Sequence, residues 1–252
     1  MLRTEPRVEA VKAQAGEMGI YLARPSGRTG EKRPGLLLMQ EIFGVNDHIQ
    51  DVVRRFAAAG YVVAAPDVFH RTGTWLSFGY DQFAETRPHT SALNEDLVVD
   101  DMQAALDFLA AQPDVDPTRI GVVGYCFGGR ASLVAAIRMP KMIKAAAIYY
   151  GGGIVADAPQ APIHRVGEVR CPVIGFFGAQ DGHIPPEAVA KLEAALTEAG
   201  VSNEIFCYPY AGHGFCCDAR PSYHPRAAQD AWHRTLGFFG AHLGPVPAVE
   251  WA

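Results

Sequence analysis

Hydrophobic residues recur along the chain in two alternating patterns, which are short apolar runs and longer stretches with helical spacing. The apolar runs have the length and continuity of strands that are buried on both faces, as in parallel sheets. The helical stretches repeat apolar residues every three or four positions. Regular alternation of this kind predicts a mostly parallel sheet with helices on both faces. We therefore expect an α/β fold built as a single domain, residues 1–252, with its core over residues 8–243.

The chain is expected to open with a two-stranded hairpin that turns near Gly16. Residues 68–92 and 151–170 have no clear period and are predicted to be irregular, the first as a long loop of the kind that often carries function. The tail, residues 244–252, contains two prolines and is expected to be loosely held. The other predicted elements are strands at residues 35–39, 61–65, 119–124, 145–150, 171–177 and 204–208, helices at residues 47–59, 94–111, 127–137, 186–199 and 225–243, and a turn at residues 114–117.

Composition and charge exclude several classes of protein. The 252 residues are 49% hydrophobic, which is too apolar for a disordered chain, and no apolar run approaches the ~18 residues of a membrane span. A net charge of -5 without a basic block leaves no electrostatic footprint for nucleic acid. Charged side chains interrupt residues 1–20 throughout, which argues against a secretory signal. We expect a cytosolic protein, monomeric or weakly self-associating, with neither nucleic acid nor a membrane as partner.

The five cysteines are expected to be free thiols. An odd number in a chain without a secretory signal argues against a disulfide framework. No pair has the Cys-x2-Cys spacing of zinc ligands, and the adjacent Cys216 and Cys217 cannot easily bind one ion together, so we predict no metal site. Most of the thiols should be buried as small hydrophobic side chains. Cys126 is the expected exception.

Cys126 stands within Gly124-Tyr125-Cys126-Phe127-Gly128, between a predicted strand and a predicted helix. This is the pattern of a nucleophile elbow, with Cys where Ser is more common. The tight turn leaves no room for side chains at the two glycines, and the helix N-terminus favours a thiolate. We predict that Cys126 is a nucleophile and that the N–H of Phe127 stabilises an oxyanion. A buried Cys beside helix-packing glycines is the alternative interpretation.

A thiolate nucleophile needs a base, and the base needs an acid that orients it. Asp181 follows one predicted strand, and His213 follows the last one, between two glycines. The order nucleophile, acid, histidine is that of hydrolases with this elbow, and parallel strands bring their carboxyl ends to one edge of the sheet. We therefore predict a triad of Cys126, His213 and Asp181. Taken alone, Asp181 is also compatible with a simple turn and His213 with a surface loop.

The segment Gln40-Glu41-Ile42-Phe43-Gly44 follows a buried strand, where an oxyanion-hole loop belongs in this architecture. The N–H of Ile42 is the candidate second oxyanion donor. Glu41 lies in a mostly apolar run, and an unpaired carboxylate there should have a raised pKa. An exposed loop acid is the alternative interpretation of Glu41.

These motifs resemble the dienelactone hydrolase (carboxymethylenebutenolidase) family across residues 8–243. The resemblance implies an α/β-hydrolase fold and a Cys-His-Asp triad that opens an enol lactone to a keto acid. It also implies that Glu41 hydrogen-bonds the resting thiol of Cys126 and takes its proton, and that Arg220 binds the carboxylate of a small anionic substrate. The matching segments are residues 40–44, 124–129, 181–185 and 212–215.

Acyl transfer through a thioester needs no cofactor, and it suits an ester that is already activated. The family has a second carboxylate-binding arginine, for which Arg71 and Arg87 are the candidates. A general esterase or thioesterase on the same fold is the nearest alternative. A thiol redox protein would need a resolving thiol, and none lies at Cys-x-x-Cys spacing from Cys126. A non-catalytic binding module would not need both Asp181 and His213.

Overall fold

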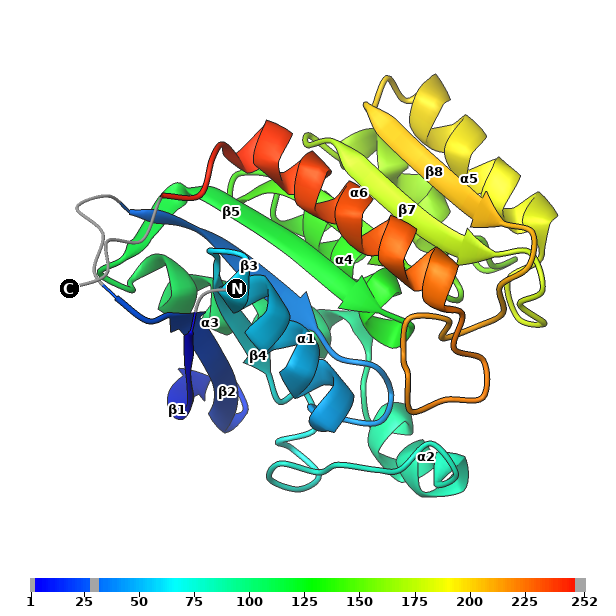
Figure 1. Cartoon of the computed structure of the whole chain (residues 1–252). Helices are drawn as coiled ribbons and strands as arrows, with labels where there is room; N and C mark the ends of the chain where they lie inside the picture. Colours follow the sequence, from blue (N-terminus) through cyan, green and yellow to red (C-terminus); the bar gives the residue numbers. More distant parts are fainter. Residues whose placement is uncertain (1–2, 28–31, 248–252) are drawn as a thin grey trace. The chain divides into compact units, whose positions relative to one another are not determined.

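The computed structural model describes residues 3–27 and 32–247, and Figure 1 labels its helices and strands. The chain divides into two compact units. The first is formed by residues 1–121 and 243–252, and the second by residues 122–242.

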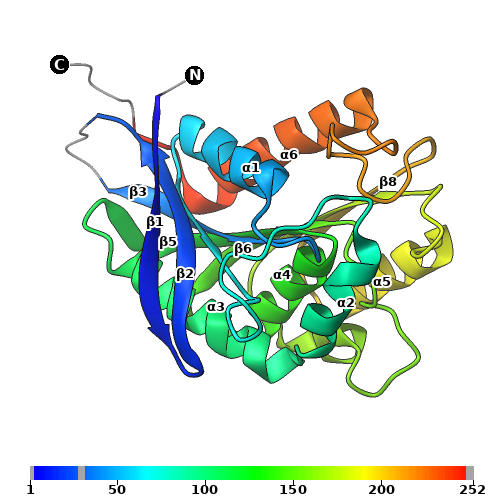
Figure 2. The ribbon, with the colours of Figure 1, turned by 90° about the horizontal axis from the view of Figure 1, so that it is seen from below.

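The first unit begins with the predicted hairpin. Its strands are β1 (Thr4–Ala13), β2 (Gly16–Pro25), β3 (Arg33–Met39), β4 (Val62–Pro66) and the first part of β5 (Val115–Tyr125), and its helices are α1 (Asp47–Ala58), α2 (Phe83–Ser91) and α3 (Glu95–Ala110). Strand β2 pairs antiparallel with β1 and with β4, whereas β3 and β4 are parallel. Within this unit, α1 covers one face of the strands and α3 covers the other (Figure 2).

The second unit is a run of parallel strands with helices on both faces. After β5 its elements are α4 (Phe127–Arg138), β6 (Ile143–Tyr149), the 3-10 helix η1 (Pro162–Glu168), β7 (Val173–Gly178), α5 (Pro186–Glu198), β8 (Asn203–Tyr208) and α6 (Pro225–Leu243). Strand β7 is parallel to both β6 and β8, and Figure 2 shows α6 on one face of these strands and α4 and α5 on the other. The strands form one eight-stranded sheet in the order β1-β2-β4-β3-β5-β6-β7-β8. This sheet confirms the predicted α/β fold.

Burial and capping explain why the elements form where the sequence predicts them. Every residue of β3, β4 and β7 is buried, as their continuous apolar sequences require. Helix α1 begins after Asn46, whose side chain accepts the N–H of Ile49 at 3.1 Å. Helix α3 begins after Asn94, which accepts the N–H of Leu97 at 2.9 Å. Such N-caps satisfy backbone donors that the first helical turn leaves without partners.

Three segments differ from the prediction. The segment 68–92 is not wholly irregular, because it contains α2, a helix with Pro88 inside it and no apolar stripe to reveal it. The segment 151–170 contains η1. The turn predicted at residues 114–117 is wrong, because β5 already starts at Val115. There the Asp116 side chain accepts hydrogen bonds from the N–H and hydroxyl of Thr118, so turn-like polar chemistry occurs beside an extended backbone.

The described part of the tail is anchored, in contrast to the loose tail that the sequence predicts. The Arg119 guanidinium donates to the carbonyl oxygens of Leu243 and Pro245, both at 2.5 Å. Val246 packs over Gly60, where an added Cβ would lie 2.7 Å from the Val246 Cβ. These contacts hold residues 244–247 on the first unit, and residues 248–252 lie outside the described part of the chain.

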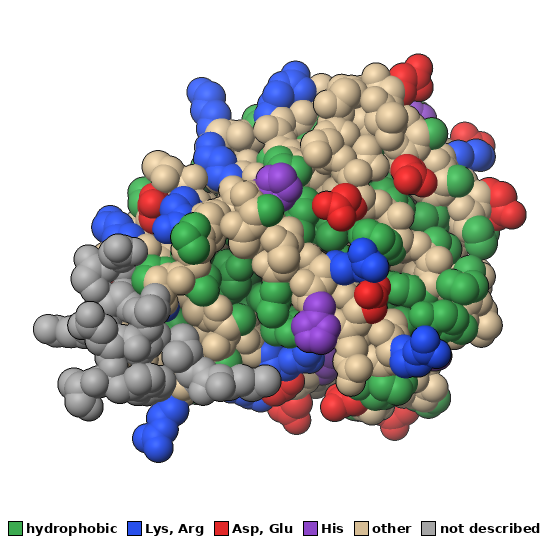
Figure 3. Space-filling view, turned by 45° about the horizontal axis from the view of Figure 1, so that its top comes forward, with side chains coloured by type: hydrophobic (Ala, Val, Ile, Leu, Met, Phe, Trp, Pro, Cys, Tyr) green, Lys and Arg blue, Asp and Glu red, His purple; other side chains and the backbone are tan. Residues whose placement is uncertain are grey.

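On the face shown in Figure 3, side chains of both signs are scattered among polar and apolar ones. Among the described residues, no helix combines the length and the apolarity needed to cross a bilayer.

Candidate active site

Cys126 occupies a strained turn between β5 and α4. Its φ of 57° and ψ of -113° lie in a region that residues other than glycine rarely adopt. Its N–H donates to the carbonyl oxygen of Tyr149 on β6 at 3.0 Å, which ties the turn to the neighbouring strand. Because Cys126 is the N-cap residue of α4, its thiol stands at the positive end of the helix dipole. The backbone geometry of a nucleophile elbow is therefore present.

The glycines around the elbow have a steric reason. A Cβ on Gly124 would lie 2.1 Å from the carbonyl oxygen of Gly128, and one on Gly129 would lie 2.4 Å from that of Tyr149. Neither position can carry a side chain unless the backbone of α4 moves away from the sheet. Phe127 is the first residue of α4, and the N–H groups of a first helical turn have no partner within the helix. Its predicted role as an oxyanion donor stays a prediction.

His213 and Asp181 are joined by a short hydrogen bond. The Nδ1 atom of His213 lies 2.7 Å from Oδ2 of Asp181, and the other carboxylate oxygen accepts the N–H of His183 at 2.8 Å. The Asp181 side chain is 1% exposed and that of His213 is 17% exposed. His213 also hydrogen-bonds the side chain of Cys126. The three residues of the predicted triad therefore lie together in the second unit, with His213 between Cys126 and Asp181.

Backbone contacts bring the two loops of this pair together. The N–H groups of Ala179 and Gln180 donate to the carbonyl oxygens of Tyr208 and Ala211, at 2.8 and 2.9 Å. A Cβ on Gly178 would lie 2.2 Å from the Ala211 carbonyl oxygen, so the close approach of the loops depends on that glycine. The loops that follow β7 and β8 are thus bonded to each other just before Asp181 and His213.

The surroundings of His213 keep it protonated at neutral pH. Burial lowers the pKa of His213, but the hydrogen bonds to Asp181 and Cys126 outweigh burial and raise that pKa to about 10. Burial also disfavours the Asp181 carboxylate, yet the hydrogen bonds from His213 and from the His183 N–H hold the pKa of Asp181 below its usual value. Protonated His213 therefore places a positive charge beside the Cys126 sulfur.

The raised pKa of His213 makes stability depend on pH. A group whose pKa rises from 6.5 to about 10 on folding contributes stability fully below about pH 6.5, and that contribution is lost as the pH rises through 10. We expect the free energy of unfolding, measured by urea denaturation, to decrease between pH 6.5 and 10. The decrease should be smaller in His213→Gln. Equally steep pH profiles for the two proteins would contradict this assignment.

Tyr150 is a neighbour of His213 that the sequence analysis did not single out. Its ring lies 5.1 Å from the His213 ring at 62°, and 5.4 Å from the Phe215 ring at 71°. Tyr150 has a φ of 38°, so its backbone is strained as well. The sequence signal that could have pointed to Tyr150 is its position at the end of a predicted strand, directly before three glycines.

Glu41 and Ile42 belong to the first unit, in the turn after β3. The Glu41 residue is fully buried, so the alternative of an exposed loop acid is wrong. The carboxylate has a hydrogen-bond partner, because the Tyr80 hydroxyl donates to Glu41 Oε2 at 2.9 Å, so the case of an unpaired acid does not apply. Ile42 lies within the turn that the bridge between Glu41 and Gly44 closes. The roles predicted for Glu41 and Ile42 stay predictions.

Arg71 is engaged in a structural ion pair. It donates to both carboxylate oxygens of Asp101, at 2.5 and 2.8 Å, and to the carbonyl oxygen of Leu97. Asp101 is fully buried, so removal of Arg71 would leave a costly buried charge. Arg71 therefore attaches the segment after β4 to α3, which makes it a poor candidate for binding substrate. Arg87 is exposed on α2.

Arg220 lies against the His213 loop, as its position in the sequence predicts. Gly214 has a φ of +75°, and a Cβ at that position would lie 2.4 Å from a guanidinium nitrogen of Arg220. The guanidinium thus packs on the residue directly after His213. This position is compatible with the predicted binding of a substrate carboxylate.

None of the five cysteines forms a disulfide, as predicted, but Cys207 and Cys216 are less buried than expected. Cys171 and Cys217 are buried, and burial raises the pKa of Cys171 to about 12. Cys207 is exposed, in contrast to the expectation that thiols other than Cys126 are mostly buried. It lies on β8, which is the last strand in the sheet order of the described residues.

Comparison with known proteins places this chain in a family. A family model described as "Dienelactone hydrolase family" matches residues 18–243. A Yersinia pestis protein named "Putative carboxymethylenebutenolidase" is 35% identical over 251 residues, covering 95% of this chain and 90% of its own length. A Bradyrhizobium protein named "Probable 2-oxo-3-(5-oxofuran-2-ylidene)propanoate lactonase" is 31% identical and covers 88% of this chain and 89% of its own length.

Structural comparison agrees with these matches. The crystal structure titled "Putative Dienelactone Hydrolase" from Klebsiella pneumoniae superposes with a TM-score of 0.86 at 31% identity. The superposition covers 95% of this chain and 99% of that one. The chain therefore belongs to the dienelactone hydrolase family and is a hydrolase with the α/β-hydrolase fold.

Proposed function

We propose that this protein opens an enol lactone to a keto acid through a thioester on Cys126. The observation that carries the proposal is the bonding of His213 to Asp181 on one side and to Cys126 on the other. This arrangement supports a thiolate–imidazolium pair at a helix N-terminus, which is a strong nucleophile near neutral pH.

The proposed reaction has two stages that balance in atoms and protons. The Cys126 thiolate attacks the lactone carbonyl carbon, the ring C–O bond breaks, and the enolate that leaves takes the proton of His213 and becomes a ketone. The neutral His213 then removes a proton from water, which attacks the thioester. The C–S bond breaks, the acid leaves, and the thiolate–imidazolium pair is restored. The N–H groups of Phe127 and Ile42 are the proposed donors to the oxyanion of both stages.

A thiolate suits an enol lactone better than an alkyl ester. An enolate is a far better leaving group than an alkoxide, so the tetrahedral intermediate expels it rather than the thiolate. The relative from Bradyrhizobium supports this class, because its printed name describes a lactone with an exocyclic double bond and a carboxylate.

A substrate panel tests the proposed function. Purified protein is assayed with enol lactones that carry a carboxylate, with neutral enol lactones, and with p-nitrophenyl acetate. We expect the highest kcat/KM for the anionic enol lactones. A higher kcat/KM for simple esters and thioesters would favour the general esterase instead.

Glu41 provides a test of the proton acceptor that the family resemblance implies. If the Cys126 thiol is still protonated when substrate binds and gives its proton to Glu41 rather than to His213, Glu41→Gln should lower kcat by about 10- to 10³-fold, because an amide cannot accept that proton. The amide oxygen can still accept the hydrogen bond of Tyr80, so the fold should persist. Thermal unfolding provides the check on the fold. Unchanged kinetics would reduce Glu41 to a structural acid.

Arg220 provides a test of substrate charge. We expect Arg220→Ala to lower kcat/KM for anionic lactones, because a bidentate contact between guanidinium and carboxylate is lost. The fall in kcat/KM should correspond to a loss of about 2–4 kcal/mol in transition-state stabilisation. Neutral esters should be unaffected. Arg226→Ala, at an exposed arginine near the start of α6, is the matched control. Equal losses on charged and neutral substrates would show that Arg220 is structural.

A further inference from the structure

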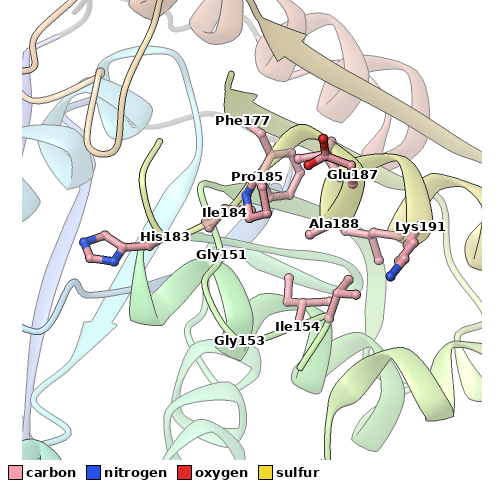
Figure 4. Close-up of a pocket in the computed structure, with 13 residues that line it drawn as sticks. Gly151, Gly153, Ile154, Phe177, His183, Ile184, Pro185, Glu187, Ala188 and Lys191 are labelled. Atoms are coloured by element: carbon pink, nitrogen blue, oxygen red, sulfur yellow. The ribbon is translucent and has the colours of Figure 1, made fainter. Parts of the chain in front are cut away.

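The second unit contains a cavity of about 240 Å³ beside the loop that carries Asp181. Its walls come from the segment after β6, the end of β7 and the first turns of α5. Figure 4 shows Ile154 on one side of the cavity and Pro185 and Ala188 on the other, with His183 and Lys191 at opposite ends. The apolar residues that line it include Ile154, Phe177, Ile184, Pro185, Ala188 and Leu192.

Two wall segments contact the elements that carry the predicted triad. The backbone of Gly151 packs on the first turn of α4, so close that a Cβ there would lie 2.8 Å from the Arg130 nitrogen. On the other side, the N–H of His183 donates to Asp181, and its ring lies 5.9 Å from the His213 ring. The cavity is therefore built from the segments that position the nucleophile and the acid.

Size and polarity define what the cavity can hold. An apolar cavity of about 150 Å³ is enough to bind benzene, so about 240 Å³ has room for an aromatic ring or a chain of several carbons. Glu187 and Lys191 line it with one charge of each sign, and both residues are exposed. The rim thus offers no net charge to a ligand, while most of the lining side chains are apolar.

We propose that this cavity binds an uncharged apolar arm of the ester substrate, an aryl ring or an alkyl chain of about four to six carbons. This inference rests on the proposed function, because the arm must belong to an ester that Cys126 attacks. It adds a second element of specificity, which selects for the bulk of a substrate independently of its charge.

The test fills the cavity and measures selectivity. Ala188 lines the cavity from α5, so Ala188→Phe places a ring inside it, whereas Ala190→Phe on the exposed side of the same helix is the matched control. Two ratios of kcat/KM are measured, p-nitrophenyl hexanoate over p-nitrophenyl acetate, and 2-naphthyl acetate over phenyl acetate. The first ratio reports an acyl arm and the second an alcohol arm.

We expect at least one ratio to exceed 1 in the wild type and to fall about 10- to 10²-fold in Ala188→Phe, because each buried methylene contributes about 0.8 kcal/mol. Activity on the small acetates should persist, and Ala190→Phe should leave both ratios unchanged. If Ala188→Phe does not fold, Ala188→Leu, which adds three carbons, should give a smaller fall. Unchanged ratios in a folded variant that fills the cavity would overturn the inference. Ester turnover that persists in Cys126→Ala would instead overturn the proposed function.

Discussion

Replacement of Cys126 by alanine is expected to lower kcat/KM by at least about 10⁴-fold, both for enol lactones and for p-nitrophenyl acetate. Loss of the nucleophile of a catalytic triad has an effect of this order, because the remaining groups contribute only binding and oxyanion stabilisation. The stability of Cys126→Ala gives a second readout, because the backbone at this position is strained. Alanine is as poorly suited as cysteine to a φ of 57°, so stability should change little.

Cys207→Ala is the matched control, because Cys207 is the exposed thiol that could react in place of Cys126. Its activity should equal that of the wild type. Iodoacetamide should alkylate Cys126 first, since partial desolvation raises the pKa of Cys207, whereas protonated His213 lies beside the Cys126 sulfur. Peptide mapping that finds Cys207 alkylated first, with activity intact, would show that Cys126 is not the nucleophile.

Asp181→Asn should lower kcat by roughly 10³- to 10⁴-fold while the fold is kept. The His183 N–H requires an oxygen at the position of Oδ1, so the amide of asparagine must turn its NH₂ group toward Nδ1 of His213. That group is a donor, so Nδ1 must become an acceptor and the proton must move to Nε2. A neutral His213 in that form cannot accept a proton from the thiol or from water.

Asp230→Asn is the control for Asp181→Asn. The Asp230 carboxylate also accepts hydrogen bonds, but its donors are Tyr208 and Arg234 rather than His213. This substitution should leave kcat within about twofold of the wild type. The NMR signal of the His213 ring gives a readout beyond activity, because its pKa should fall in Asp181→Asn. If kcat were lost without a change in that pKa, Asp181 would not be the group that raises the pKa of His213.

The sequence by itself determined the features that depend on neighbouring residues. Short apolar runs such as residues 35–39 favour strands buried on both faces, and the asparagines at 46 and 94 start helices through their own side chains. The spacing of glycines around Cys126 predicts the elbow, because the steric conflict at Gly124 involves a carbonyl only four residues away. The α/β fold and the family follow from such local patterns taken in order.

Only the tertiary structure decided which distant residues meet. Glu41 and Tyr80 are 39 residues apart in the sequence, so no local pattern shows that Glu41 accepts a hydrogen bond from a hydroxyl group. Arg71 and Asp101 are 30 residues apart, so no local pattern shows that Arg71 forms an ion pair. The exposure of Cys207 follows from the place of β8 at the edge of the sheet. The cavity beside Asp181 depends on how the segment after β6 packs against α5. The physical reason is that these contacts form between segments that only the complete fold brings together. A sequence pattern, in contrast, reports the conformation of one segment at a time.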